Sequence, residues 1–274
     1  MRKLGIIRRG HMGDILLIEP IIDALRDSYN SITIFTDYPH VANLLGIFDT
    51  VLPYDEHQRI QPWDFDRTLC LKYEIYPGVN HLDGYATDAG VTLRHRVPAI
   101  RQGFPQVRQS PYGLIAPEVS SWIRPMREWS LRCFNELSNR LASLSGISIA
   151  ILDSATSFDE MLSLVEHCSF FVGNDSGPAI LAQCFGRPTF VIFGATHPNL
   201  ILLRDDAIGI WKDVGCNGCK HLARQTEIEC ASPLCLEHLT VDDVVDQMLS
   251  AGWLVGLHDQ GGATAQTVKN AGEK

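Results

Sequence analysis

The sequence alternates between short apolar runs and stretches with a helical period. The run KLGIIR at 3–8 predicts a strand, and the glycine-bearing turn RGHMGD follows it. From Asp14 onward, the apolar residues that share one helical face are Ile15, Ile18, Ile22 and Leu25. Further along this half, the pattern predicts strands over 31–36, 50–54 and 67–73 and a helix over 40–46. Strands that alternate with helices predict a parallel sheet covered by helices.

A second series of the same kind follows an irregular segment. Residues 98–111 (PAIRQGFPQVRQSP) have no period and contain three prolines, so we predict a domain boundary there. The domains are then residues 1–104 and residues 111–255, and both are of ordinary size. The second series predicts strands over 112–118, 147–152, 170–173 and 189–194, and helices over 131–144, 158–168 and 178–186. The polar, glycine-rich tail at 256–274 is typical of disorder.

Composition narrows the functional classes. Apolar residues make up 45% and charged residues 20% of the 274 residues, which is globular composition. A net charge of -9 argues against nucleic-acid binding and against more than peripheral contact with an anionic membrane. The basic spot RRGH at 8–11 is interpreted as a solvated turn. No apolar run has the length of a signal-peptide core or a membrane span, so we expect a cytoplasmic protein.

Four of the eight cysteines crowd into one short segment. They form Cys216-x2-Cys219 and Cys230-x4-Cys235, a spacing that can close a tetrahedral site of four thiolates for zinc or iron. Disulfides and reduced thiols are the alternatives, and a reducing setting fits the other, isolated cysteines. Four protein ligands leave no open position on a metal. A metal bound there is therefore predicted to be structural, with no cofactor required for catalysis.

The polar cluster NDSG separates a buried strand from a helix at 174–177. Asp175 or Ser176 could cap the helix, which is what these residue types do most often. Alternatively, the cluster lies where open α/β sheets bind ligands, and its backbone donors face an anion. The local sequence leaves both interpretations open.

Three blocks together resemble glycosyltransferase family 9, the ADP-heptose heptosyltransferases of lipopolysaccharide synthesis. They are GHMGDILLIEPIIDALR at 10–26, RPMREWS at 124–130, and the long stretch from 157 to 198 that contains NDSG. The resemblance implies an α/β GT-B fold, with two Rossmann-like domains facing each other across a cleft. It also implies an inverting transfer of a sugar, possibly heptose, from a nucleotide-diphosphate sugar to the hydroxyl of a glycan or other acceptor.

The resemblance also implies roles for particular residues. Asp14 matches the aspartate that acts as general base on the acceptor hydroxyl, although it could instead cap the helix that begins at Ile15. Arg127 stands where the family usually has lysine, and it would bind the departing diphosphate; its alternative is an ordinary exposed arginine. The donor would also contact the remaining matching residues, Asp175, Ser176 and Gly177, with Ser120 and Ser121 as further phosphate donors.

The chain departs from the family pattern in two places. Ile180 occupies the position of a common family histidine, and the half before Pro111, which would hold the acceptor, is short. These departures leave two alternatives to the transferase. One is a catalytically inactive relative that binds a sugar nucleotide or a protein, and the other is a different GT-B enzyme such as an epimerase or hydrolase. ADP-heptose is the donor that the resemblance implies.

Overall fold

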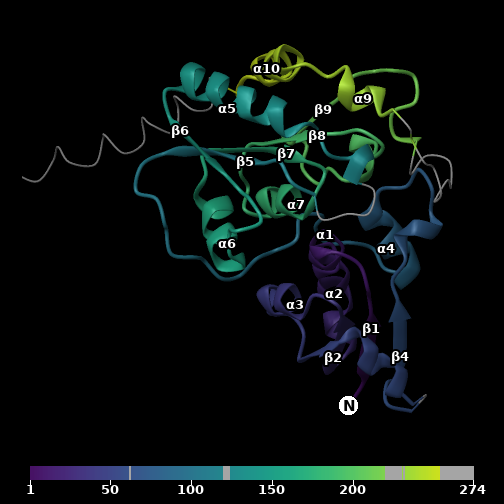
Figure 1. Cartoon of the computed structure of the whole chain (residues 1–274). Helices are drawn as coiled ribbons and strands as arrows, with labels where there is room; N and C mark the ends of the chain where they lie inside the picture. The colour runs from purple at the N-terminus through teal and green to yellow at the C-terminus, as the bar shows by residue number, and fades with distance from the viewer. Residues whose placement is uncertain (62, 120–123, 220–229, 231, 254–274) are drawn as a thin grey trace, which may run out of the picture.

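The computed structural model describes residues 1–61, 63–119, 124–219, 230 and 232–253. Its elements form two α/β halves, which lie one above the other in Figure 1. Within these residues, no helix has the length and apolar content needed to cross a membrane.

The first half contains a four-stranded parallel sheet in the order β3-β2-β1-β4. Its register is continuous, with Ile6 of the first strand opposite Ile34 on one side and Leu69 on the other. The strands are β1 (Lys3–Ile7), β2 (Ser31–Thr36), β3 (Thr50–Pro53) and β4 (Arg67–Cys70), and the helices are α1 (Met12–Leu16), α2 (Glu19–Leu25), α3 (Pro39–Leu45) and α4 (His81–Ala89). The single helix predicted from Asp14 is therefore two helices, and α4 is an element that the periodicity did not predict.

The second half contains a five-stranded parallel sheet in the order β6-β5-β7-β8-β9. Its strands are β5 (Tyr112–Ala116), β6 (Ser148–Ile151), β7 (Phe170–Asn174), β8 (Thr189–Ile192) and β9 (Ile208–Ile210), and its helices are α5 (Leu131–Ser145), α6 (Phe158–His167), α7 (Gly177–Cys184), α9 (Leu234–Glu237) and α10 (Val241–Ser250). The predicted elements of this half are present, and β9, α9 and α10 are additional. The segment between α4 and β5 forms neither helix nor strand. The predicted domain limits at 104 and 111 remain predictions.

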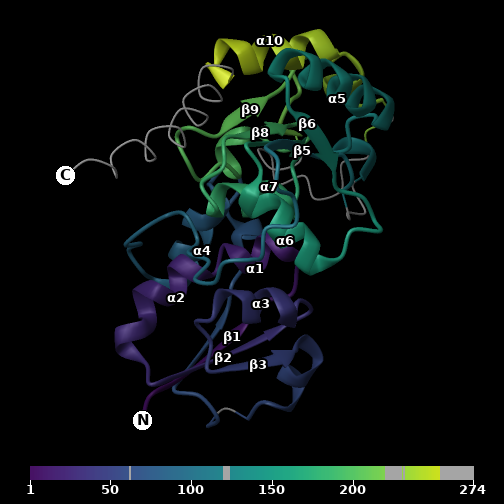
Figure 2. The ribbon, with the colours of Figure 1, turned by 90° about the vertical axis from the view of Figure 1, so that its left-hand side faces the viewer.

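Helices cover both faces of the second sheet. Figure 2 shows α5 and α10 on the outer face, with α6 and α7 on the face toward the first half. Because both faces are covered, β5 and β7 are buried along their whole length, as expected for central strands of a parallel sheet. The buried core under α6 and α7 continues into the first half, joining Phe171 and Leu181 to Leu16 and Ile34 in one cluster.

The two halves meet where α1 packs against the start of α7. Ile180 is only 5% exposed, and its Cδ1 would lie 2.7 Å from a Cβ added to Gly13. A Cβ at Gly177 would likewise clash with Met12 Cε. Glycine at both positions therefore lets the two helices approach closely. This contact sets the turn before α1 opposite the turn before α7.

Candidate functional site

Two loops of the second half are fixed together at the carboxyl edge of its sheet. The chain leaves β5 toward β6 and returns to β7 on the other side, so the edge between β5 and β7 is a topological switch point. Asn174, the fully buried last residue of β7, donates its Nδ2 to the carbonyl of Pro117 (2.6 Å). Its Oδ1 accepts from the backbone N–H of Trp129 (3.0 Å). One amide thus holds both loops at the place where such sheets bind ligands.

Arg127 belongs to the loop that is fixed in this way. The indole of Trp129, which is 1% exposed, donates to the carbonyl of Leu239 (2.9 Å) and anchors the loop in the core. The Arg127 side chain is 19% exposed, and its Nη2 lies 3.3 Å from Asp175 Oδ2. The same nitrogen donates to Thr196 Oγ1 (3.2 Å). The interpretation of Arg127 as an ordinary exposed arginine is therefore wrong.

Ser176 and Asp175 do not cap the helix that follows them. Ser176 is the N-cap residue of α7 with an extended backbone, but its side chain makes no cap hydrogen bond. Its buried Oγ has no hydrogen-bond partner among the described residues. Asp175 is 4% exposed and directs its carboxylate toward Arg127 instead. The capping interpretation is wrong here, and the polar atoms of this turn are left for another partner.

Asp14 lies at the third position of α1 rather than before the helix. Its Oδ2 accepts from the backbone N–H of His11 (2.7 Å), so the carboxylate supports the start of α1 from inside the helix. Its Oδ1 lies 3.2 Å from Arg8 Nη2, and the Asp14 side chain is 13% exposed. The backbone φ of Gly10 is 111°, and a Cβ there would lie 2.5 Å from Asp14 Oδ2. Only glycine therefore suits the turn that bends the chain around this carboxylate.

A pocket of about 100 Å³ between the halves collects these side chains. Asp14 comes from the first half, and Arg127 comes from the loop before α5. Asp175, Ser176, Gly177 and Ile180 come from the turn and helix after β7. A second pocket of about 300 Å³ shares His11, Val119, Ser176 and Gly177 with the first and extends between Tyr38 and Phe158. The two pockets therefore meet at the Ser176–Gly177 turn.

The polar atoms of the first pocket have unused hydrogen-bonding capacity. Arg127 Nε, Ser176 Oγ and Asp175 Oδ2 are buried and have no hydrogen-bond partner among the described residues. Buried polar atoms are nearly always paired, so such a group needs an explanation. The arginine nitrogen and the serine hydroxyl can donate to an anion, whereas the carboxylate oxygen can accept from a hydroxyl. This combination fits a ligand that carries both phosphate and sugar hydroxyls.

Two aromatic side chains form a wall of the pocket that the sequence did not predict. The rings of Tyr73 and His81 are stacked with their centroids 3.7 Å apart, and both line the pocket. Burial raises the pKa of the Tyr73 hydroxyl well above its ordinary value, and the nearby charges of Asp14 and Glu74 raise it further. His81 begins α4, the helix without an apolar period, so only the tertiary structure places the two rings here.

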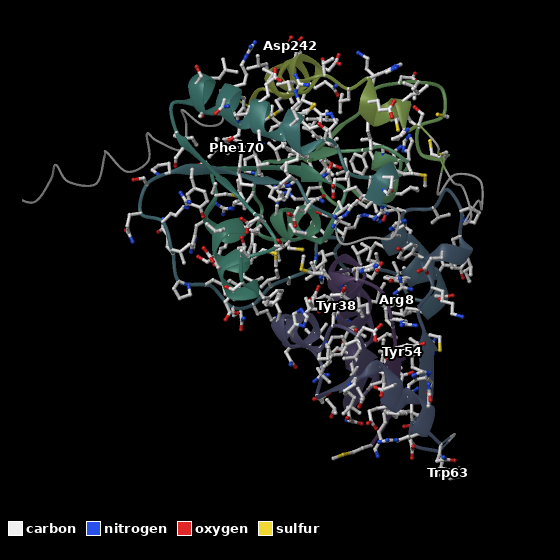
Figure 3. All side chains as sticks on the ribbon, viewed as in Figure 1. Arg8, Tyr38, Tyr54, Trp63, Phe170 and Asp242 are labelled. Carbon is white, nitrogen blue, oxygen red and sulfur yellow. The ribbon has the colours of Figure 1, made fainter. Side chains whose placement is uncertain are left out.

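Arg8 is a second residue whose environment differs from the prediction. It was expected on a solvated turn, yet it is 7% exposed, whereas the Arg9 side chain is 75% exposed. Arg8 follows β1 directly, and its guanidinium lies beside Asp14, which lines the pocket. Figure 3 shows Arg8 where the first half adjoins the second, far from Trp63 at the opposite tip.

The remaining predicted site residues lie at or beyond the limits of the described structure. Ser120 and Ser121 lie outside the described residues. Cys216 is exposed, Cys219 and Cys230 pack partly buried against Met126 and Ala195, and Cys235 is buried. Within the described part of the chain, no group of three or more His, Cys, Asp or Glu side chains is arranged to hold a metal ion.

Comparisons with known proteins agree with this architecture. Residues 132–229 match the model of glycosyltransferase family 9 (heptosyltransferase). No curated protein sequence matches the chain. Among solved structures, the iron-containing dodecameric glycosyltransferase TibC from enterotoxigenic E. coli superimposes with a TM-score of 0.72 at 16% identity, over 93% of this chain and 77% of TibC.

Two further solved structures are similar over almost their whole length. The E. coli heptosyltransferase WaaC with ADP has a TM-score of 0.62 at 14% identity, over 93% of this chain and 99% of WaaC. E. coli ADP-heptose LPS heptosyltransferase II has a TM-score of 0.61 at 14% identity, over 95% of this chain and all of that protein. At these identities the likeness establishes the fold of the whole chain, and the family model covers residues 132–229. The chain thus has the two-domain GT-B fold of these heptosyltransferases, and its second half contains a region that matches glycosyltransferase family 9.

Proposed function

We propose that the chain is an inverting glycosyltransferase that moves a sugar from a nucleoside diphosphate sugar to an acceptor hydroxyl in the pocket between its halves. The observation that carries this proposal is a group of buried polar atoms of Arg127, Asp175 and Ser176 that have no hydrogen-bond partner among the described residues. They line the same pocket as Asp14. Donor-binding groups come from the second half and the base comes from the first. A transferase needs this arrangement, because donor and acceptor must meet between them.

Asp14 supplies the base in this mechanism. One of its oxygens accepts from His11 N–H and the other faces Arg8, and each oxygen has a second lone pair for the acceptor hydroxyl. As the hydroxyl oxygen bonds to the anomeric carbon, its proton passes to Asp14. The bond between that carbon and the diphosphate breaks at the same time, and its electron pair leaves with the phosphate oxygen. Attack from the face opposite the leaving group inverts the configuration.

The second half stabilises the negative charge that develops on the diphosphate. Arg127 offers a planar cation with an unpaired Nε, and Ser176 offers an unpaired hydroxyl beside the N-terminus of α7. Unpaired N–H groups and the helix dipole favour an anion at that terminus. Asp175 accepts a hydrogen bond from a hydroxyl of the donor sugar. Its negative charge would repel the phosphate groups, so it faces the sugar. The assignment of Ser120 and Ser121 as further phosphate donors rests on the family resemblance alone.

ADP-heptose is the donor to test first. TibC has been solved in complex with ADP-D-beta-D-heptose, and WaaC with ADP. Ile180, which replaces the common family histidine, packs over Gly13 at the contact between the halves, so its position serves packing here. Binding of the donor nucleotide therefore depends more strongly on Arg127, Ser176 and the backbone of α7 than it would if a histidine stood at position 180.

A pair of variants tests this function. Excess ADP-heptose should raise the Tm of the wild type, since a ligand at a hundredfold excess over Kd stabilises the fold by about 2.7 kcal/mol. Asp175→Ala should abolish that shift and leave the far-ultraviolet spectrum unchanged. Asp14→Asn should keep the shift and lose about 10²- to 10⁴-fold in turnover, the usual contribution of a general base.

Other results would contradict the assignment. Wild-type turnover by Asp14→Asn would remove Asp14 as the base. Loss of donor binding in that variant, with turnover intact at saturating donor, would mean that Asp14 belongs to the donor site and that the roles proposed for the two halves are reversed. Tight donor binding without transfer to any acceptor would favour the inactive, ligand-binding relative. Release of free sugar without an acceptor would favour a hydrolase. GDP- and UDP-sugars serve as the matched controls for the nucleotide.

We further propose that Cys216, Cys219, Cys230 and Cys235 hold a structural zinc or iron ion. The support for this is the spacing of the four cysteines and their proximity: burial raises the pKa of the Cys235 thiol to about 11, and the other three thiols lie near enough to add to this shift. Such a metal would tie the loop after β9 to α9. It would supply no step of the transfer, because four thiolates leave no open position.

Metal analysis tests this second assignment. Purified protein should contain about one zinc or iron per chain, and Cys216→Ser should lose it together with thermal stability. Cys70→Ser is the control, because Cys70 is exposed at the end of β4, outside the cluster. Metal-free protein with undiminished stability would contradict the assignment of a structural metal.

A further inference from the structure

The Arg8 guanidinium is shared between two carboxylates of the first half. It forms a bidentate pair with Glu74, with Nη2 donating to Oε1 (2.7 Å) and Nη1 donating to Oε2 (3.1 Å). Nη1 also donates to the carbonyl of Leu71 (3.0 Å). Nη2 lies 3.2 Å from Asp14 Oδ1. Arg8 is therefore a bridge between a partner at the surface and a partner in the pocket.

Aromatic rings enclose this bridge. The Arg8 guanidinium carbon lies 5.0 Å from the ring centroid of Tyr73 and 5.2 Å from that of Tyr85, which is within range of a cation–π contact. Arg8 is 7% exposed and Asp14 13%, whereas Glu74 is 47% exposed. Burial alone would lower the pKa of Arg8, but proximity to Tyr85, Asp14 and Glu74 raises it above its ordinary value. Arg8 is thus a fixed positive charge beside the base.

We propose that Arg8 is the positioning residue of the base. Arg8 is shared between Asp14 and Glu74, and it keeps the Asp14 carboxylate ionised and aimed into the pocket. Glu74 offsets enough of the positive charge of Arg8 for Asp14 to accept a proton. The inference rests on the proposed role of Asp14. An arginine paired with Asp14 alone would hold that carboxylate as a poor base. Before proton transfer the three side chains carry a net charge of one negative unit, and after it they are neutral.

The proposal predicts that two substitutions shift the titration of Asp14 in opposite directions. Removing the positive charge in Arg8→Gln favours the protonated form of Asp14, so its titration should move to higher pH. Removing the negative charge in Glu74→Gln leaves Arg8 uncompensated, so the titration of Asp14 should move to lower pH. The second shift should be the smaller, because Glu74 is half-exposed and screened by solvent. A site that merely loosened would instead move both variants toward the same solvated value.

Other groups also face Asp14, and the experiment must hold them constant. Tyr73, Tyr85 and His81 belong to the first half, as do His11 and Tyr38 beside the start of α1. Arg127 and Asp175 face it from the second half. Each of these groups is the same in the wild type and in the variants, so a difference between their midpoints reports Arg8 or Glu74. Asp175 is the second carboxylate that lines the pocket, so each measurement is repeated with Asp175→Asn.

The test follows the Asp14 carboxyl by NMR in protein labelled with ¹³C-aspartate, a measurement that needs no acceptor. Asp14→Asn identifies the resonance by its disappearance. We expect its midpoint to rise by about one pH unit or more in Arg8→Gln, to fall in Glu74→Gln, and to stay near the wild type in Arg8→Lys, which keeps the charge. The acidic limb of the rate profile with ADP-heptose should move in the same directions.

Midpoints that do not move, or that move in the same direction in Arg8→Gln and Glu74→Gln, would overturn the proposal. Should Arg8→Gln fail to fold, the midpoints of Arg8→Lys and Glu74→Gln still decide it. Failure of the underlying function is a separate result. If Asp14→Asn keeps full turnover, the base assignment fails, whereas a loss of turnover combined with fixed midpoints removes only Arg8 and Glu74 from the mechanism.

Discussion

Serine residues before three helices of this protein show that one residue type serves two purposes. Ser130 Oγ accepts from Cys133 N–H (3.2 Å) and Ser157 Oγ accepts from Glu160 N–H (3.3 Å), so both cap their helices. Ser176 occupies the same position before α7 and makes no such bond. Its residue type, its position and its extended backbone are the same as in the two capping serines, so nothing local distinguishes it from them. Only the buried, unpartnered Oγ does so.

Substitution of these serines by alanine should separate the two purposes. Ser130→Ala and Ser157→Ala should each lower the free energy of unfolding by about 1 kcal/mol, because a helix N-cap is lost. Ser176→Ala should leave that free energy unchanged or raise it slightly, since a buried hydroxyl without a partner is removed. It should nevertheless reduce the Tm shift produced by ADP-heptose. Urea unfolding with and without the donor measures both quantities, and a cost for Ser176→Ala equal to that of the other two would restore the capping interpretation.

At the scale of elements, apolar period predicted the strands and the longer helices but not their interruptions. The run from Asp14 to Leu25 keeps its apolar face, yet the helix breaks after Leu16 and restarts at Glu19 ahead of Pro20. The period could not reveal this break, because the apolar face continues through it. α4 was missed because its buried residues include His81, Gly84 and Tyr85, which carry no clear apolar stripe. Arg8 was misjudged for a related reason, since its partner Glu74 lies far away in the sequence.

The start of α10 offers a pH-dependent test of an element that the apolar pattern does not predict. Asp243 Oδ1 accepts from Lys212 Nζ (2.7 Å) and its Oδ2 accepts from Thr240 N–H (2.9 Å). The bond from Lys212, followed by that from Thr240, lowers the pKa of Asp243 to about 2. A lowered folded-state pKa contributes stability that is present above the unfolded value of about 3.9 and is lost as the pH falls through about 2.

Asp243→Asn should therefore destabilise the protein at pH 7, and its difference from the wild type should shrink between pH 4 and pH 2. After allowance for solvent screening of this partly exposed group, we expect a cost of about 1 kcal/mol. Asp242→Asn is the control: Asp242, at the top of Figure 3, is 77% exposed and should change stability by less than about 0.5 kcal/mol. A difference for Asp243→Asn that stays constant from pH 7 to pH 2 would contradict the assignment of its charge.

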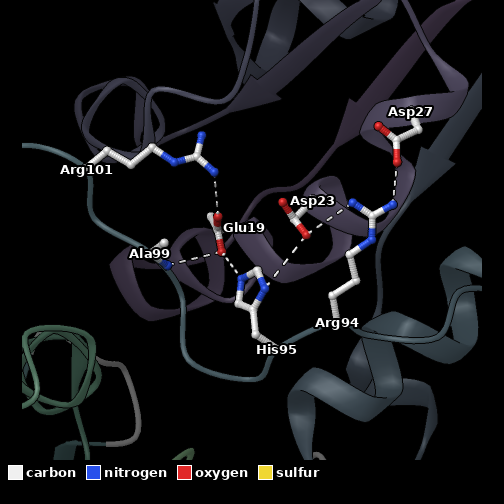
Figure 4. Close-up of polar contacts among 7 residues, drawn as sticks. All are labelled: Glu19, Asp23, Asp27, Arg94, His95, Ala99 and Arg101. Atoms are coloured by element: carbon white, nitrogen blue, oxygen red, sulfur yellow. Dashed lines mark hydrogen bonds and ion pairs between the residues drawn. The ribbon is translucent and has the colours of Figure 1, made fainter.

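At the scale of the whole molecule, the site exists only because the two halves are held together. Asp14, Arg127 and Asp175 are distant in sequence, and the packing of α1 against α7 brings them to one pocket. The family resemblance predicted these residues, but no local pattern predicted their meeting. The segment between α4 and β5 contributes to the assembly by folding back onto α2, as Figure 4 shows.

The anchor of that segment is Glu19, whose side chain is fully buried. Its Oε2 is bonded to His95 Nε2 (2.7 Å) and accepts from the backbone N–H of Ala99 (3.1 Å), and its Oε1 lies 3.4 Å from Arg101 Nη2. Breaking one side of a buried, charged network leaves the other side unsatisfied, which is costly. Glu19→Gln keeps the size of the side chain, so its effect reports the charge.

We expect Glu19→Gln to lower the free energy of unfolding by about 2 kcal/mol and to speed tryptic cleavage between Arg94 and Arg101. Asp27→Asn is the matched control, because Asp27 follows α2 and contacts the same segment through Arg94. Asp27 is bonded to Arg94 at 2.5 Å, but its side chain is 78% exposed, so its loss should cost less than about 0.5 kcal/mol. Urea unfolding and timed proteolysis of the two variants decide the matter. Equal effects would mean that the connecting segment is held along its surface, and that the buried carboxylate of Glu19 is not the group that fixes this segment to α2.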